Sequence, residues 1–184
     1  ARFTRFCGEP LEPRTLLAVN PQLLMDITAS PPGVSISSCE IKDFGGIAYF
    51  AASDASGIEL WRSDGTTPGT YLVKDINPGT SGSTPKNLTA VGASLYFAAT
   101  TSVGAELWKS DGTNAGTVFV KDIASGSSHS IPSNFTNVNG TLFFAANDGL
   151  NGTELWKSDG TEGGTVLVKD VQAGPGGSVP RELV

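Results

Sequence analysis

Hydrophobic residues recur along this chain in short runs that glycine, proline and polar residues separate. The run at residues 47–52 returns at 94–99 and 141–146, each time with aromatic residues followed by paired alanines. A run that is apolar on both faces predicts a central strand covered above and below. No window carries apolar residues at the 3.6-residue spacing of a helix over helical length, so we expect almost no helix.

Three further strands accompany each central run. A short strand precedes it at 40–44, 87–91 and 134–138, and glycine-containing turns such as Asn139-Gly140 predict a hairpin between the two. A strand containing Glu-Leu-Trp follows, and a strand ending in Lys-Asp-Ile or Lys-Asp-Val closes the unit at 71–76, 118–123 and 166–171. Each unit is thus predicted to be a four-stranded antiparallel sheet.

The strongest repeat is an eight-residue word with Glu-Leu-Trp at its start and Ser-Asp-Gly-Thr at its end. It occupies residues 59–66, 106–113 and 154–161, so its tryptophans are 47 and 48 residues apart. Four short strands in a period of this length are typical of a β-propeller blade. A β-solenoid would need shorter coils and fewer hairpins. The predicted fold is therefore all-β and built of propeller-like blades.

The repeats divide the chain into segments. Residues 1–19 form an N-terminal arm, and 20–39 hold an orphan outer strand at 22–27 plus a loop. The blades follow at 40–85, 86–132 and 133–180, and residues 181–184 open a fourth repeat. A closed ring takes at least about four blades, so we expect a partial propeller or a fragment of a longer array. An open strand edge would invite pairing with another chain.

The repeated word resembles that of the bacterial ELWxxDGT repeat proteins, and the resemblance covers residues 20–184. The stretch Leu11–Leu17 resembles the LEPR-XLL motif near the N-terminus of exported repeat proteins of planctomycetes and other bacteria. Together these resemblances imply a secreted or cell-surface bacterial protein. They bring no catalytic residue, and residues 1–19 remain open to a second interpretation as an extended arm without a sorting role.

Most repeated polar and aromatic residues are expected to be structural. Asp-Gly pairs with nearby serine and threonine hydroxyls favour tight turns. The glutamates are expected to form solvated cross-strand pairs with Lys74, Lys121 and Lys169. The tryptophans are expected to pack between blades rather than to serve as sugar platforms. The motif residues are Glu59, Trp61, Asp64, Gly65, Glu106, Trp108, Asp111, Gly112, Glu154, Trp156, Asp159 and Gly160.

No cofactor is expected, with one loop left as a weak calcium candidate. Asn147, Asp148 and Asn151 offer several oxygens close together. The corresponding loop at 100–104 has no carboxylate, so a calcium cage is not a property of the repeat. Cys7 and Cys39 could pair in an oxidising compartment or remain unrelated thiols.

Charge and hydropathy exclude two classes of partner. The net charge of −6, with scattered lysines and arginines, argues against nucleic acid, which attracts clustered cations. No apolar run is long enough for a membrane-spanning helix.

The function favoured by these patterns is a non-enzymatic extracellular scaffold for adhesion, surface coating or assembly with other chains. Catalytic sites normally combine residues that occur once, whereas this chain repeats its polar residues. The alternatives are a lectin-like module that binds a glycan or a protein, and a fragment of a secreted hydrolase acting on glycans. Sialidase-like chemistry would need an arginine cluster, yet the blades hold only Arg62 and Arg181. The single histidine, His129, stands in a serine-rich loop and is expected to be solvated.

Overall fold

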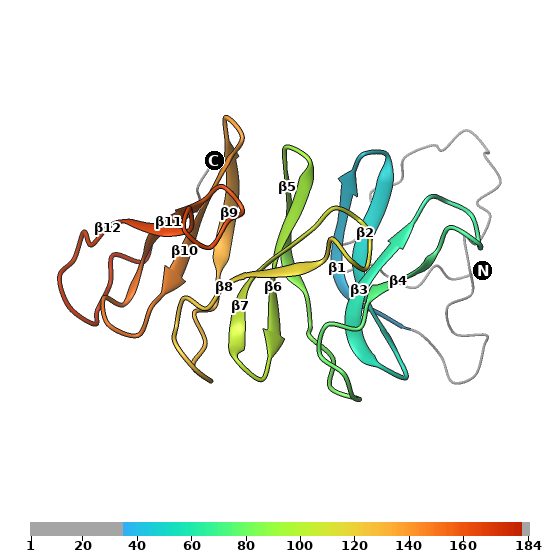
Figure 1. Ribbon diagram of the computed structural model, residues 1–184, viewed down its shortest axis with the longest axis horizontal. Helices are drawn as coiled ribbons and strands as arrows, with labels where there is room; N and C mark the ends of the chain where they lie inside the picture. The colour runs from blue at the N-terminus through green and yellow to red at the C-terminus, as the bar shows by residue number, and fades with distance from the viewer. Residues whose placement is uncertain (1–34, 182–184) are drawn as a thin grey trace, which may run out of the picture.

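The computed structural model describes residues 35–181 of the 184-residue chain. The predictions for the arm at 1–19, the orphan strand at 22–27, the side chains of Cys7 and Cys39, and residues 182–184 lie outside the described part. Within it, the chain forms three four-stranded antiparallel sheets and no helix (Figure 1). We call these sheets blades 1, 2 and 3.

In each blade the strands lie in the order in which the chain makes them. Blade 1 consists of β1 (Ser35–Phe44), β2 (Ile47–Asp54), β3 (Gly57–Ser63) and β4 (Tyr71–Lys74). Blade 2 consists of β5 (Lys86–Val91), β6 (Ser94–Thr101), β7 (Gly104–Ser110) and β8 (Val118–Lys121). Blade 3 consists of β9 (Ser133–Val138), β10 (Thr141–Asn147), β11 (Thr153–Ser158) and β12 (Val166–Lys169).

These sheets confirm the predicted four-stranded units. The doubly apolar runs are β2, β6 and β10, which are interior strands with neighbours on both sides. Strand boundaries differ by a few residues from the predicted ones: β1 starts at Ser35 rather than at residue 40, and β4 ends at Lys74 rather than at 76. A closed ring is not seen in the described residues.

A register shift recurs between the third and fourth strands. In blade 1, Leu60 pairs with Lys74 and Trp61 pairs with Leu72, which leaves Val73 as an extra residue. Blades 2 and 3 have the same shift. A bulge bends the strand and re-aims the side chains beside it. Val73 consequently joins a cluster that reaches into the next blade.

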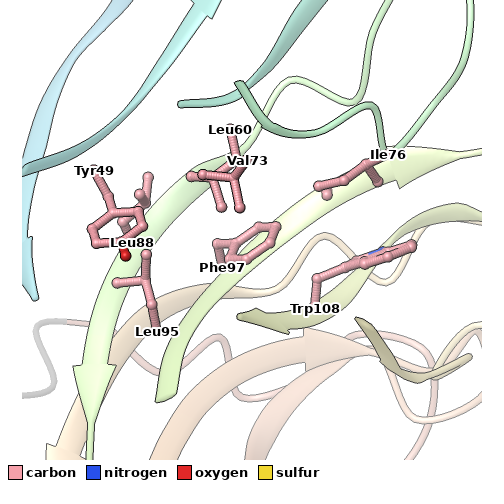
Figure 2. Packing of buried hydrophobic residues seen from close by; sticks show 9 residues of the cluster. Tyr49, Leu60, Val73, Ile76, Leu88, Leu95, Phe97 and Trp108 are labelled. Atoms are coloured by element: carbon pink, nitrogen blue, oxygen red, sulfur yellow. The ribbon is translucent and has the colours of Figure 1, made fainter. Parts of the chain in front are cut away.

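The blades pack face to face in chain order, and their first strands β1, β5 and β9 contact one another in turn. We call the face of a blade toward the preceding blade its front and the face toward the next blade its back. One hydrophobic cluster joins the back of blade 1 to the front of blade 2, and a second joins blades 2 and 3 in the same way. Figure 2 shows the first cluster, with Leu60, Val73 and Ile76 of blade 1 facing Phe97 and Trp108 of blade 2. A single blade would leave these apolar faces in water, so the row of blades stabilises each member.

Candidate functional site: the repeated joint between blades

The Ser-Asp-Gly-Thr segment forms a tight turn after the third strand of each blade. In blade 2, Asp111 Oδ1 accepts the backbone N–H and the hydroxyl of Thr113 at 2.9 and 2.7 Å. Gly112 has a φ of +92°, and its N–H donates to Ser110 Oγ at 2.9 Å. These hydrogen bonds hold the pKa of Asp111 below its usual value. The same bonds recur around Asp64 and Asp159, so the structure places the predicted turn residues as turn formers.

A second glycine completes this turn and was not recognised from the sequence. Gly116 lies so close to Asp111 that a Cβ atom there would overlap the carboxylate, and Gly69 and Gly164 stand in the same way against Asp64 and Asp159. The recurrence of Gly-Thr five residues after each aspartate was the available signal.

The predicted glutamate–lysine surface pairs are wrong. Glu59, Glu106 and Glu154 are each 0% exposed. In blade 2, the Glu106 carboxylate accepts N–H groups of Ile123 and Ser130, both at 2.9 Å, and the Ser130 hydroxyl at 2.6 Å. The loop after the fourth strand folds back over the start of the third strand, where Ile131 N–H donates to Ala105 O. The glutamate therefore fastens this loop to its own blade.

Equivalent bonds fasten the loops of the other blades. Glu59 accepts from Asn77 and Ser83, and Glu154 accepts from Val171, Gln172 and Ser178. The serines at 83, 130 and 178 recur at the period of the repeat, and that recurrence could have identified them as the partners.

The three glutamates differ in their electrostatics. For Glu59 and Glu106, desolvation outweighs the hydrogen bonds and raises the pKa, and the nearby charge of Asp122 adds to the effect at Glu106. At Glu154 the bond from Ser178 dominates and lowers the pKa.

The repeated lysines link one blade to the next instead of pairing with glutamate. Lys74 of β4 donates to Thr117 O of blade 2 at 2.8 Å, and also reaches Asn114 O at 3.5 Å. Lys121 of β8 donates to Glu162 O of blade 3 at 3.3 Å. All three acceptors belong to the segment that follows the Asp-Gly turn, so this segment in blades 2 and 3 receives the lysine of the blade before it.

A tyrosine makes a second contact with the same turn. A Cβ atom on Gly112 would collide with the Tyr49 hydroxyl of blade 1, and one on Gly160 would collide with the Tyr96 hydroxyl of blade 2. Burial raises the pKa of both tyrosines, and the adjacent Asp111 and Asp159 carboxylates act in the same direction. Glycine in this turn thus meets two requirements, a positive φ and room for the preceding blade.

The tryptophans are buried at the front of their blades. Trp61, Trp108 and Trp156 are 7%, 9% and 7% exposed, and Trp108 lies in the cluster between blades 1 and 2 (Figure 2). Their indole Nε1 atoms are buried without a hydrogen-bond partner in the described part of the chain. Buried indoles contribute large apolar contact areas and do not offer a face to a sugar ring. The structure thus places them as packing residues.

The weak calcium candidate is a self-contained loop. Asn147 Oδ1 accepts Gly149 N–H at 2.7 Å, while Asp148 Oδ1 accepts the N–H groups of Leu150 and Asn151 at 2.9 and 2.8 Å. The Asn151 amide donates to the other oxygen of Asp148. The three candidate residues do lie close together, but their side chains form hydrogen bonds with one another and with the backbone of the same loop. Across residues 35–181, no three His, Cys, Asp or Glu side chains gather as a metal site.

A hollow at the end of blade 3 also lacks a reactive group. It measures about 480 Å³ and lies beside Ser133, Asn134 and Arg181 at the end of blade 3, and blade 2 has a smaller counterpart of about 190 Å³. Neither is lined by a carboxylate, histidine or cysteine. His129 is exposed, as expected, and its Nδ1 accepts Ala105 N–H at 3.0 Å.

Comparison with known proteins adds no assignment, because no family model and no curated protein matches the chain. Within the described residues there is also no helix long and apolar enough to cross a membrane.

Proposed function

We propose that this chain is a non-enzymatic extracellular or cell-surface repeat scaffold that assembles with other protein chains. One observation carries the proposal: the repeated polar residues are engaged in fastening loops, forming turns or joining blades. The buried Glu106, the Asp111 turn and the Lys121 contact illustrate the three roles. Residues used in this way stabilise a structure and leave no convergent set of groups for catalysis.

The location rests on sequence resemblance alone. The resemblance of the repeated word to ELWxxDGT proteins, and of residues 11–17 to the LEPR-XLL motif, supports export to the bacterial surface or beyond. Nucleic acid is not proposed as a partner, because the chain has a net charge of −6 and its lysines and arginines are scattered.

Sedimentation velocity over a wide range of protein concentration tests the assembly part. We expect the weight-average sedimentation coefficient to rise with concentration and to fall again on dilution. A compact monomer at every concentration would refute assembly by this chain. Turnover in a screen of oligosaccharide substrates would refute the non-enzymatic part independently.

A further inference from the structure

A cavity of about 190 Å³ opens on the back of blade 2, where the chain leaves this blade for β9. Ala98 lines it, and the partner of Ala98 on β7 is Leu107, which belongs to the cluster between blades 2 and 3. Paired residues of neighbouring strands point to the same face of a sheet, so the cavity lies on that side of blade 2. Ile131 and Pro132, which lead into β9, also line it. The cavity therefore belongs to a joint of which both blades are described.

Short side chains account for the open space. Thr100 and Ala105 pair two residues further along the same two strands, so they point to the same face as Ala98. Blade 1 has Ile58 at the position of Ala105, and blade 3 has Thr153 there. An alanine leaves unfilled the volume that a larger side chain would occupy. The size of the cavity thus depends on residue 105, and the repeat itself accepts a larger residue at this position.

The backbone around the cavity is strained. Thr84, Asn87 and Ile131 have φ values of +50°, +60° and +48°, although this left-handed conformation is unfavourable for a β-branched residue such as isoleucine. The Ile131 side chain is 67% exposed, so its burial does not offset the cost. A hydrogen bond from Ile131 N–H to Ala105 O at 3.2 Å holds the conformation. Strained residues that the surrounding structure holds in place cluster at ligand-binding sites.

One positive charge stands at this cavity. Lys86 is exposed, and its pairing with Ala98 puts its side chain on the same face. None of the residues that line the cavity has a carboxylate, so Lys86 favours an anionic ligand. Thr84 and Thr100 add hydroxyl groups, which can both donate and accept hydrogen bonds. Asn87 adds a side-chain carbonyl, because its amide nitrogen already donates to a carbonyl of the loop before β9 at 3.0 Å.

The size and charge of the cavity limit the ligand. Pockets for drug-sized molecules begin at about 300 Å³, so a cavity of about 190 Å³ suits one small ring. A carboxylate carries the single charge that one lysine can pair with, whereas a phosphate carries more charge and favours the forked donors of arginine. A neutral sugar would leave the charge of Lys86 without a partner. The lining thus fits a ring that carries one carboxylate and several hydroxyls.

We propose that this cavity binds a single acidic sugar residue, a hexuronate, of an extracellular polysaccharide. The sugar carboxylate pairs with Lys86, and the sugar hydroxyls exchange hydrogen bonds with Thr100 and Asn87. The C–H face of the ring packs on Ile131 and Pro132. This inference rests on the proposed extracellular location, and it adds a ligand through which the scaffold adheres to a surface.

Nuclear magnetic resonance of the full-length, nitrogen-15-labelled chain tests the site with methyl glucuronide as the probe. The amide shifts that change should belong to residues 86–87, 98–100 and 131. The dissociation constant should be about 1 mM, as expected of a ligand this small. Methyl glucoside has the same ring without the carboxylate, and acetate has the carboxylate without the ring. Each should bind at least about ten-fold more weakly than methyl glucuronide.

Two substitutions introduce residues that the repeat uses at the equivalent positions, so the fold should accept them. Ala105→Ile fills the cavity with the side chain that blade 1 carries as Ile58, and it should abolish binding of methyl glucuronide. Lys86→Ser removes the cation and introduces the residue that blade 3 carries as Ser133. This change should weaken binding at least about ten-fold. Lys157→Ser is the control and should leave the affinity unchanged, because it removes the same charge from an exposed residue that does not line the cavity.

Three results would overturn the inference. They are unchanged amide shifts with about 10 mM methyl glucuronide, equal binding of methyl glucoside or acetate, and unchanged affinity in Ala105→Ile or Lys86→Ser. Sedimentation velocity of the same samples separates this inference from the proposed function. Assembly without binding of methyl glucuronide would refute only the ligand, and binding by a chain that stays monomeric would refute only the assembly.

Discussion

Blades 2 and 3 carry the same repeated word but have different surroundings, because among residues 35–181 blade 2 lies between two blades and blade 3 has a neighbour only at its front. Glu106 and Glu154 occupy the same position and bind the same kind of loop, yet the pKa of Glu106 is raised and that of Glu154 is lowered. The difference follows from desolvation, which is the largest cause at Glu106, whereas the hydrogen bond from Ser178 is the largest cause at Glu154.

The exposure of equivalent apolar residues also differs between the two blades. Val120 is enclosed within the second cluster, whereas its equivalent Val168 faces solvent. The structural unit that buries these residues is therefore the joint between two blades. Substitutions at matched positions of blades 2 and 3 test this difference in burial.

The largest difference is expected for leucine truncation in the third strand. Leu107 is fully buried between blades 2 and 3, and Leu155 is half-buried at the same position of blade 3. Leu107→Ala should lower the free energy of unfolding by about 3 kcal/mol, because it creates a cavity in the core. Leu155→Ala should cost about half as much. Urea denaturation at low protein concentration measures both, and equal losses would contradict the comparison.

The Asp-Gly turn gives the next largest difference. Gly65→Ala places a side chain at a positive φ in open space, which costs about 1–2 kcal/mol. Gly112→Ala has the same backbone cost and also collides with the Tyr49 hydroxyl, so it should cost about 1–3 kcal/mol more.

A double variant isolates the contribution of the contact. Adding Tyr49→Phe should recover part of the loss at Gly112 and none at Gly65. Thermal unfolding of the four variants measures the coupling, and identical responses of the two glycine variants to Tyr49→Phe would rule out the contact.

The pH dependence of the buried glutamates should have opposite signs. The native pKa of Glu106 is raised above the ordinary 4.5. Its contribution to the free energy of unfolding is therefore fully present below pH 4.5 and is lost as the pH rises through the native pKa. The lowered pKa of Glu154 gives a contribution that is present above 4.5 and lost as the pH falls through its native pKa.

Replacing each glutamate by glutamine removes its own pH dependence. Glu106→Gln should abolish a decline in stability above pH 4.5, and Glu154→Gln should abolish a rise in stability with pH below 4.5. Urea denaturation between weakly acidic and neutral pH measures the difference from the wild type. The same sign for both variants would contradict the difference between the two carboxylates.

The smallest difference concerns the lysines. Lys121→Met removes one hydrogen bond to Glu162 O at 3.3 Å and should cost about 0.5 kcal/mol. Lys169→Met should leave the stability unchanged, because Lys169 is exposed and makes no such bond within residues 35–181. Urea denaturation of the two variants measures the difference, and equal losses would contradict it.

The sequence predicted the features that depend on local pattern. The four strands of each unit follow from apolar runs and glycine turns, and the Asp111-Gly112 turn follows from short-range hydrogen bonds. The tryptophan packing followed from one residue type recurring at one structural position.

The glutamate partners were missed because they are distant in sequence. Ser130 lies 24 residues beyond Glu106 in a loop that folds back, and no local pattern predicts that return. The register shift beside Leu107 likewise redirects the fourth strand, and Lys121 donates to the next blade instead of pairing across the strands. The exposure of Val168 depends on whether a neighbouring blade exists, so its own sequence does not determine it. The family resemblance, the export motif and the extracellular location stay predictions.

Hydrogen–deuterium exchange of the amides at 118–123 and 166–171 tests the role of the joint most directly. In dilute solution, residues 166–171 should exchange at least about ten times faster than residues 118–123, because no blade within residues 35–181 packs on the back of blade 3. Equal exchange in both segments would contradict the account.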